Sequence, residues 1–412
     1  MKQTSLMLTA ICLALPGCAV NEVITAEETE LIVADAPPDE SMLLDIGIVE
    51  FEGGIAQDND PEKSGTFEEI RSAEVRYVPY HLKTTLQGTG HWGAVRVIPS
   101  RNAFTDIVIS GAIEKSDGEF VTLNITVDDA RGQHWYSESY STQTGISSYS
   151  ENRDKREDPY QKVFNDIAND LKVFVEQLPP KSVHELRQVT ELKFFADMSP
   201  RAYGEHLTTD EEGQMAIVRL PADNDPSVDR LRQIRERDRL VVDTLNEHYA
   251  NFYYGIAIPY HSWRKTAREE AINYRQVKRS AAMQTLMGAV VLAGSLAVDT
   301  GSSSYSKSQM QKSLQYIGIE QGLDAIMTGF SRRSEAGMHL ESIKELSESF
   351  GAEAAPMVVT VEGETRRLTG TAAAQYESWR RLLKEIYEVE TGFVETADTI
   401  DPDPVRIPEP TG

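Results

Sequence analysis

The chain has 412 residues, of which 40% are apolar and 26% are charged, a composition typical of a folded protein rather than a disordered one. Its 65 acidic residues outnumber its 41 basic residues, so the formal net charge is -24. Because nucleic acid and anionic lipid surfaces would repel such a chain, we expect no nucleic-acid partner. Both cysteines, Cys12 and Cys18, lie near the amino terminus. A disulfide framework, a cysteine zinc site and a catalytic thiol are therefore excluded from the rest of the chain.

The amino terminus has the pattern of a secretory leader. Lys2 supplies a positive charge, and an apolar run from Leu6 to Leu15 follows that is too short to span a bilayer as a helix. The run ends in the letters LPGC, which resemble the bacterial lipoprotein box and place its cysteine at Cys18. The resemblance implies that residues 1–17 are a signal peptide. It also implies that Cys18 is the lipidation site and carries fatty-acyl chains such as palmitate.

The same resemblance predicts where the protein resides. Ala19, rather than an aspartate, follows the cysteine, which implies sorting to the outer membrane with the body facing the periplasm. The acyl chains would bind the membrane without a transmembrane helix. The alternative is an ordinary secretory signal cut near Ala19, with the cysteine incidental. We favour lipidation because a cysteine at such a cleavage site is uncommon.

Residues 18–41 are rich in acidic residues, contain a Pro-Pro pair and have no basic residue. Like charges repel one another, so this composition predicts an extended acidic tether between the anchor and the body. The alternative is an acidic segment that binds a partner.

Region 42–178 is predicted to be a compact α+β domain. Apolar alternation and Gly-containing turns indicate strands, and apolar residues at spacings of three and four indicate helices at 66–88 and after Asp158-Pro159. Pro79 is expected to break or kink the first helix. The candidate strands are Leu43–Phe51, Trp92–Ile98, Asp106–Lys115, Phe120–Asp128 and His134–Tyr140. We predict a β-α-β-β-β-α sandwich with its helices on one face of the sheet.

This region resembles the amino-terminal domain of TolB. The resemblance rests on the order of elements, the opening strand LLDIGIVEF and the hairpins TDIVISGAIEKSDGEFVTLNITVDDARGQHWYSESYS. It covers about a third of the chain and extends to the curli-secretion lipoprotein and to lipoprotein activators of penicillin-binding proteins. It implies a domain that binds protein partners in the envelope or assembles into rings, and that is not an enzyme.

Residues 181–390 are predicted to form a second, mainly helical domain. It contains two long helices separated by an interruption at Gly255 and Pro259, and a small hairpin at Met357–Leu368. An aromatic cluster around that interruption is expected to pack inward, although a partner-binding patch is the alternative. Residues 391–412 are rich in Asp and Pro and are predicted to be a disordered tail.

Residues 281–298 form an uncharged segment of mostly small residues that follows several arginines and lysines. We expect this segment and a returning helix to form a long helical hairpin, because small residues at helical spacing let two helices approach closely. The glycines of this packing or self-association hairpin, at 281–329, are Gly288, Gly294, Gly301, Gly318, Gly322 and Gly329.

Three interpretations of this hairpin remain open. It packs on itself and on the body, it joins subunits, or it enters the membrane. The charges of the predicted returning helix and the marginal length of the segment favour the first interpretation.

No phosphate-binding loop, dinucleotide fingerprint, nucleophile elbow or HExxH motif occurs, and the eight histidines are scattered singly. We therefore predict neither an enzyme nor a bound cofactor or metal. The predicted function is that of a lipid-anchored envelope protein acting as an interaction or assembly factor, through a protein partner or self-association. The alternative is a subunit of an oligomeric outer-membrane pore or secretion complex.

Overall fold

A computed structural model describes ten stretches of the chain. They are residues 28–54, 67–101, 103–145, 147–150, 157–222, 224–297, 341–346, 348, 356–361 and 364–391. As predicted, the protein is α+β, with an amino-terminal sheet followed by a mainly helical part.

The strands and helices of the amino-terminal part follow one another closely. They are β1 (Ile46–Ile48), α3 (Glu68–Thr89), β2 (Val95–Val97), β3 (Ile107–Ser116), β4 (Phe120–Asp129), β5 (His134–Gln143) and α4 (Gln161–Glu176). The remaining elements are α5 (Pro180–Met198), α6 (Pro200–Tyr203), β6 (Leu207–Thr209), β7 (Met215–Ile217), α7 (Pro226–Ala297), β8 (Met357–Val361), β9 (Glu364–Leu368) and α9 (Ala372–Thr391).

The main sheet has the strand order β2-β1-β3-β4-β5. Strand β1 is parallel to both of its neighbours, and β3, β4 and β5 form an antiparallel meander. All five candidate strands are present. The observed order is β-α-β-β-β-β-α, so the predicted order β-α-β-β-β-α lacks one strand. Alternate residues of β4 are buried, which confirms that one face of this strand points to the core.

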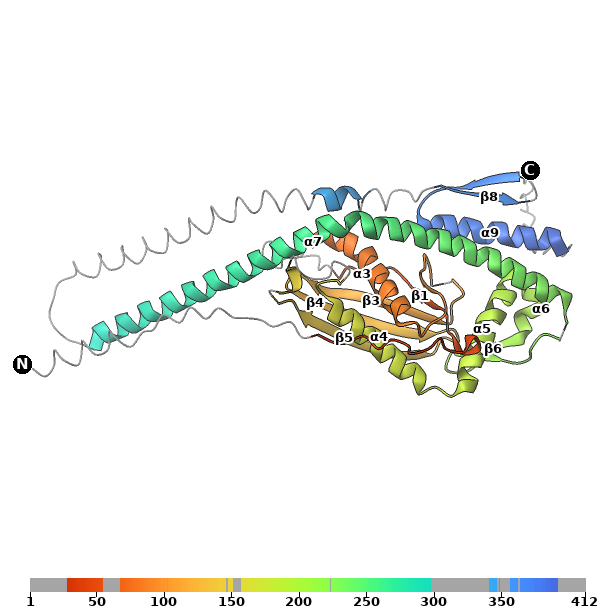
Figure 1. Ribbon diagram of the computed structural model, residues 1–412, viewed down its shortest axis with the longest axis horizontal. Coiled ribbons are helices and arrows are strands. Elements are labelled where there is room, and N and C mark those ends of the chain that lie inside the picture. The colour runs from red at the N-terminus through yellow and green to blue at the C-terminus, as the bar shows by residue number, and fades with distance from the viewer. Residues whose placement is uncertain are drawn as a thin grey trace, which may run out of the picture.

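Helices α3 and α4 cover the buried face of the sheet (Figure 1). Most of the apolar residues that predicted these helices are buried there, whereas Phe174 and Leu178 are half-buried. The buried ones are Ile70, Val78, Leu82 and Leu86 of α3 and Val163, Phe164, Ile167 and Leu171 of α4. Two turns have the glycine backbone that a hairpin needs, with φ of 84° at Gly118 and 85° at Gly132.

Of the expected break or kink at Pro79, the break is wrong, because α3 is one helix from Glu68 to Thr89. Proline removes one helical hydrogen bond and costs about 3 kcal/mol in a helix interior. Here Pro79 lies in a buried stretch with Tyr77, Val78 and Tyr80, and α3 packs against the sheet, α4 and α7. This tertiary packing offsets the local cost.

The expected interruption at Gly255 and Pro259 is also wrong, because α7 runs through both residues as a single helix of 72 residues. Ile256, Tyr260 and Trp263 lie on its inner face and are 0%, 1% and 3% exposed. Their burial holds the helix on the body through the positions where sequence alone would end it.

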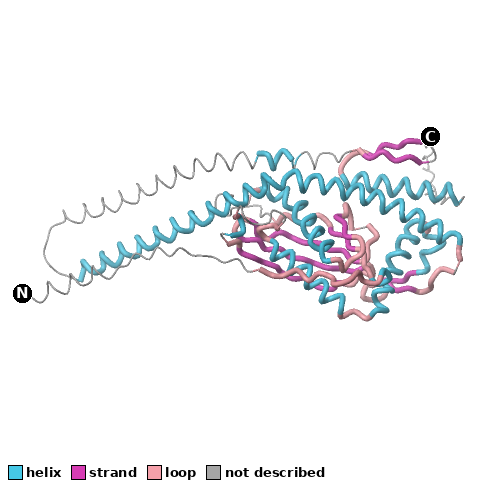
Figure 2. Tube along the Cα trace, viewed as in Figure 1, coloured by secondary structure: helices cyan, strands magenta, loops and turns pink. Residues whose placement is uncertain are grey.

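The last elements of the chain return to the first half of α7 (Figure 2). Asp238 of α7 is 4% exposed and accepts hydrogen bonds from Trp379 Nε1 at 3.1 Å and from Tyr376 at 3.4 Å. The predicted hairpin is present as the antiparallel pair β8 and β9, and it lies beside α9 (Figure 1). The apolar side of α9 is buried.

One cluster of buried side chains runs through both predicted domains, from Leu44 in the sheet region to Tyr387 in α9. The boundary between 42–178 and 181–390 therefore remains a prediction.

The acidic segment 18–41 is attached to the body over part of its length. The carbonyls of Thr29 and Glu30 accept hydrogen bonds from Asn165 and Asn169 of α4.

Candidate functional site

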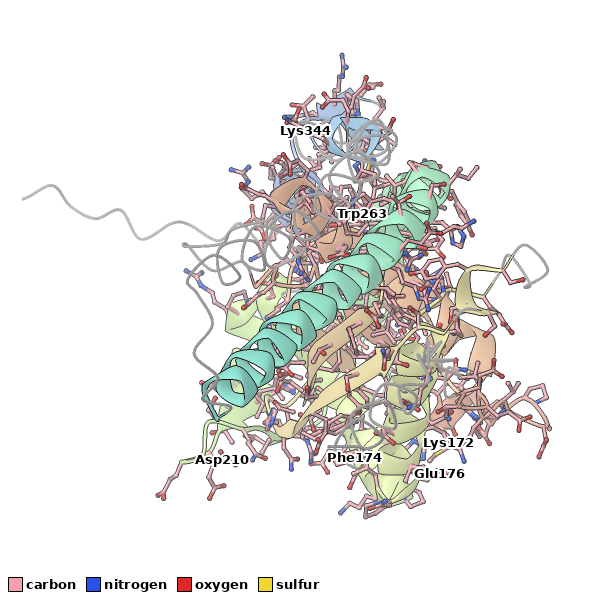
Figure 3. The ribbon with its side chains drawn as sticks, turned by 90° about the vertical axis from the view of Figure 1, so that its left-hand side faces the viewer. Lys172, Phe174, Glu176, Asp210, Trp263 and Lys344 are labelled. Atoms are coloured by element: carbon pink, nitrogen blue, oxygen red, sulfur yellow. The ribbon has the colours of Figure 1, made fainter. Side chains whose placement is uncertain are left out.

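A long helical arm leaves the body at the carboxyl end of α7, and this arm is one candidate for a functional feature. The arm consists of residues 273–297. Figure 1 shows it projecting beyond the sheet, and in the end-on view of Figure 3 it points toward the viewer. Arg268 is 9% exposed against the body, and an α-helix from there to Ala297 is about 44 Å long.

The arm is held at its base by a buried ion pair. The Arg264 guanidinium donates hydrogen bonds to Asp158 at 2.8 and 2.9 Å, and both side chains are 2% exposed. Burial alone would raise the pKa of Asp158, but the charge and hydrogen bonds of Arg264 outweigh it and hold that pKa well below its usual range. The Arg264 guanidinium also lies 4.1 Å from the Tyr260 ring centroid.

A second buried carboxyl group lies beside this pair. Glu74 of α3 accepts hydrogen bonds from Tyr260 of α7 and from Ser116 of β3. Burial raises its pKa, although Arg71 at 3.4 Å opposes the shift. The network thus joins α3, the sheet and α7 through groups that are costly to leave unpaired.

His81 completes the contacts of α3 with α4 and α7. Its Nδ1 lies 2.8 Å from the Tyr253 hydroxyl, and its Nε2 lies 2.9 Å from Gln161 Oε1. Burial lowers the pKa of His81, while the nearby Asp158 opposes that shift. The imidazole is therefore neutral at pH 7.

The β3–β4 turn touches the backbone of the arm's base. A Cβ atom on Gly118 would lie 2.3 Å from the Arg264 carbonyl oxygen and 2.9 Å from the Arg268 nitrogen. The turn and α7 can approach this closely only because residue 118 has no side chain.

The aromatic cluster of α7 belongs mainly to the core, as we expected. Tyr249, Phe252, Tyr260 and Trp263 are at most 7% exposed, while Tyr254 is 66% exposed. The cluster packs α7 on α3 rather than sealing a corner between two helices. For example, the rings of Tyr77 and Tyr253 stack at 4.6 Å.

The predicted site residues fall in two groups. Gly288 and Gly294 lie on the backbone of the arm. Cys18 lies outside the described residues, and so do the other four hairpin glycines, Gly301, Gly318, Gly322 and Gly329. Lipidation at Cys18 and the returning half of the hairpin thus remain predictions.

Two of the arginines that precede the uncharged segment have a structural role. Arg264 and Arg268 are buried at the arm's base, whereas Lys265 between them is exposed. These two arginines therefore do not form part of a solvent-facing basic flank.

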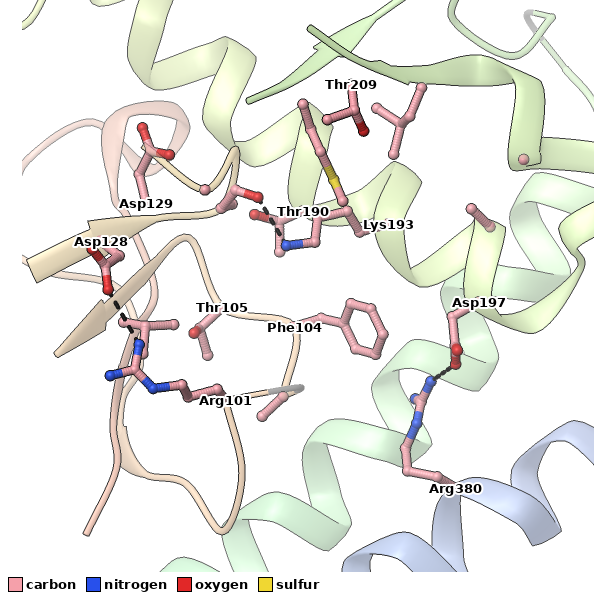
Figure 4. A pocket seen from close by; sticks show the side chains of 18 of the residues that line it. Arg101, Phe104, Thr105, Asp128, Asp129, Thr190, Lys193, Asp197, Thr209 and Arg380 are labelled. Atoms are coloured by element: carbon pink, nitrogen blue, oxygen red, sulfur yellow. Dashed lines mark hydrogen bonds and ion pairs between the residues drawn. The ribbon is translucent and has the colours of Figure 1, made fainter. Parts of the chain in front are cut away.

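A cleft of about 920 Å³ lies at the other end of the body, between the sheet, α5, β6 and α9 (Figure 4). Its walls carry the cations Arg101, Lys193, Arg380, Arg381 and Lys384 and the acids Asp128, Asp129, Asp197 and Glu377. Lys193 of α5 donates to the Ala130 carbonyl at 2.8 Å. Burial lowers the pKa of Lys193, and the nearby Asp129 opposes that shift.

Most acids of the cleft already have partners. Asp129 accepts two hydrogen bonds from the Arg131 guanidinium and one from Trp135. Asp128 pairs with Arg101. Asp197 is shared by two cations on α9, Arg380 and Lys384.

Sequence reasoning missed both the buried ion pair and the cleft. Asp158 and Arg264 are separated by 106 residues, so no local spacing links them. A usable signal was the place of Arg264 directly after Trp263, on the apolar side of a predicted helix, where a charge needs a partner. Lys193 gave no comparable signal.

Two kinds of feature are absent from the described part of the chain. No cluster of three or more His, Cys, Asp or Glu side chains there could hold a metal ion. In the same residues, no helix combines the length and apolar character needed to cross a membrane.

The comparisons with known proteins do not show a family. No family model matches the sequence. No curated protein matches it either. Among solved structures, the chain is similar to a single-substitution variant of PelC from Paraburkholderia phytofirmans, described as a dodecamer. The two are 17% identical over 37% of this chain and 96% of that chain, and the TM-score is 0.20. A score this low carries no argument about fold or function.

Proposed function

We propose that this protein is a lipid-anchored protein of the cell envelope that acts as an interaction or assembly factor rather than as an enzyme. In this proposal Cys18 carries the lipid, the body faces the periplasm from the outer membrane, and the arm makes contact with a protein partner or with further copies of the chain. The TolB-type resemblance of region 42–178 is in keeping with such a role.

The observation that carries the proposal is the projection of α7 beyond the sheet (Figure 1). A helix of apolar, uncharged sequence is poorly stable in water on its own, because most helical stability in proteins comes from packing an apolar face. Residues 281–297 of the arm contain no charged residue. A second surface that packs against this segment would stabilise it.

The buried ion pair and the Gly118 turn support the same proposal. They fix the direction of the arm where it leaves the body, so that a partner would contact a surface of defined orientation rather than a mobile segment. A fixed direction lowers the entropy that is lost on binding.

The arm is tested by replacing Gly288 and Gly294 together with Leu in the full chain and measuring the mass of the particle in detergent by light scattering. We expect the wild-type chain to form a defined oligomer or a complex with a co-purifying envelope protein, and the double variant to lose it. Leu at both positions would hold a packed helix away.

The matched control is Gly255→Leu on the same helix. Gly255 is exposed, and a Cβ atom there meets no atom within 4 Å. This variant should keep the assembly. A wild-type chain that is monomeric and brings no partner, or an assembly that both variants retain, would contradict the proposed role of the arm.

The anchor is tested separately by measuring the intact mass of the protein purified from membranes. We expect a chain that begins at Cys18 and carries added acyl mass, and we expect Cys18→Ser to leave the membrane fraction. An unmodified Cys18 would refute the anchor while leaving the test of the arm intact.

A further inference from the structure

The two border strands of the main sheet differ in length and in how they are covered. Strand β2 has three residues and packs against α7, where the Val97 N–H donates to Asn246 Oδ1 at 3.0 Å. Strand β5, at the opposite border, has ten residues, and within the described part of the chain it pairs only with β4 (Figure 1). Folded proteins usually shorten or cover a border strand, because its unpaired backbone groups can pair with another strand. The border at β5 is neither short nor covered by a further strand of the described chain.

The register of β5 shows which of its backbone groups point outward. The Thr144 N–H donates to the Glu119 carbonyl at 2.7 Å, in the register of the β4–β5 ladder. Inward and outward hydrogen-bonding positions alternate along an antiparallel strand, so the N–H and C=O groups of Ser137, Ser139 and Ser141 point away from β4. All three residues are exposed, and no backbone hydrogen bond from another segment of the described chain reaches them.

The composition of β5 lacks the features that protect an exposed border strand. Such strands commonly carry lysine, proline or a central bulge, each of which hinders pairing. Strand β5 has the sequence HWYSESYSTQ, with no Lys, Arg or Pro, and its one carboxylate is Glu138. Its only register shift with β4 lies near one end, between Val127 and Asp128. From Tyr136 to Gln143 the strand is therefore regular and able to pair.

The residue order of β5 indicates that its partner is a second copy of the same strand. Antiparallel pairing about a two-fold axis at Ser139 places Ser139 opposite its own copy and Ser137 opposite Ser141, so the outward positions match in size. In this register Glu138 faces Tyr140 of the other copy. Like charges directly opposite each other destabilise a strand pair, and here the one carboxylate of the strand does not face itself.

We propose that two copies of this chain pair through β5, antiparallel about Ser139, so that their main sheets join into one. The three central residue pairs exchange about six backbone hydrogen bonds. Because each chain has a formal net charge of -24, added salt strengthens the pairing by screening the repulsion between the copies. This inference goes beyond the proposed function and rests on neither the arm nor the anchor.

The register is tested by cross-linking the full chain in detergent with a short bis-maleimide. Residue 139 and its copy lie opposite each other, with their Cα atoms about 5.5 Å apart, so Ser139→Cys should give a covalent dimer. Ser137→Cys is the matched control, because residue 137 and its copy lie about 14 Å apart along the paired strands. This variant should not cross-link by itself, whereas Ser137→Cys combined with Ser141→Cys should. The unsubstituted chain gives the background from its own cysteines.

The pairing is tested by light scattering on chains that also carry Gly288→Leu and Gly294→Leu, so that any contribution of the arm is removed. We expect a dimer when Ser139 is intact or replaced by Ala, and a monomer with Ser139→Pro. Proline blocks pairing at the border, yet it costs no bond to β4, because the N–H that it removes points outward. Ser139→Lys should also give a monomer, because it places two like charges opposite each other without changing the backbone.

Three results would overturn the proposal. They are a monomer when Ser139 is intact, equal cross-linking of Ser139→Cys and Ser137→Cys, and a dimer that both Ser139→Pro and Ser139→Lys retain. Cross-linking of Ser139→Cys to a different envelope protein in place of a second copy would also overturn it, since it would assign the border of the sheet to another partner.

Discussion

The guanidinium of Arg264 and the carboxylate of Asp158 form a two-point ion pair, 2.8 and 2.9 Å long, inside the protein where α7 leaves the body. Forming a buried pair of this kind costs desolvation energy. Its main consequence is that removing either partner leaves an unpaired buried charge and destabilises the fold. It ties the direction of the arm to the loop that precedes α4.

Asp158→Asn should lower the free energy of unfolding by about 3–5 kcal/mol, because it leaves the Arg264 charge buried without its partner. The measurement is chemical denaturation followed by circular dichroism. Glu236→Ala is the control, because it removes an exposed partner of Arg239 and should cost less than about 1 kcal/mol. Similar losses in the two variants would show that the buried pair contributes no more to the free energy of unfolding than an exposed pair does.

The unfolding of the protein should depend on the protonation of His81. Its pKa in the fold lies below its unfolded value of about 6.5, so the unfolded state binds more protons as the pH falls. The stability that comes from a neutral His81 is therefore complete above about pH 6.5 and is lost as the pH falls through that value toward the folded pKa.

His81→Gln should accordingly lose less stability than the wild type between pH 7.5 and pH 5.5, measured as the shift in the denaturation midpoint. His184 is exposed, and His184→Gln should follow the wild-type pH profile. An unchanged profile in His81→Gln would refute this assignment.

Gly118→Ala should destabilise the protein more than Gly213→Ala. Both glycines have positive φ, 84° and 82°, so each alanine pays about 1–2 kcal/mol for the left-handed backbone. At Gly118 the new Cβ also meets the backbone of α7, whereas at Gly213 nothing lies within 4 Å.

We expect the difference between these two variants to be about 1–3 kcal/mol, the usual cost of overpacking. Thermal unfolding of both variants in parallel measures it. Equal destabilisation would mean that the turn is able to move away from α7.

Trp379→Phe should loosen α9 from α7. It removes the indole N–H that Asp238 accepts at 3.1 Å and leaves a buried carboxylate short of one partner, at a cost of about 1–3 kcal/mol. Tyr387→Phe is the control, because no residue in the described part of the chain forms a hydrogen bond with its hydroxyl. Hydrogen exchange of the α9 amides should be faster in Trp379→Phe and unchanged in Tyr387→Phe.

Local sequence patterns were sufficient to predict most of the individual elements. The alternation of Val121, Leu123, Ile125 and Val127 predicted β4 and its buried face, and the spacing of apolar residues predicted α3 and α4. These signals are reliable because the side-chain period of a strand or helix is imposed by its own backbone. The aromatic residues of α7 were likewise correctly expected to pack inward.

The sequence by itself determined the α+β class, the strands of the main sheet, the overall acidity and the glycines of the sharp turns, all of which depend on neighbouring residues. The tertiary structure decided that helices continue through Pro79 and Pro259, since burial against distant elements offsets the local cost of proline. It also decided which charges are buried and which line the cleft. Asp158 meets Arg264, and Asp197 meets Arg380, only after segments more than a hundred residues apart have packed together, and no local pattern encodes such a contact.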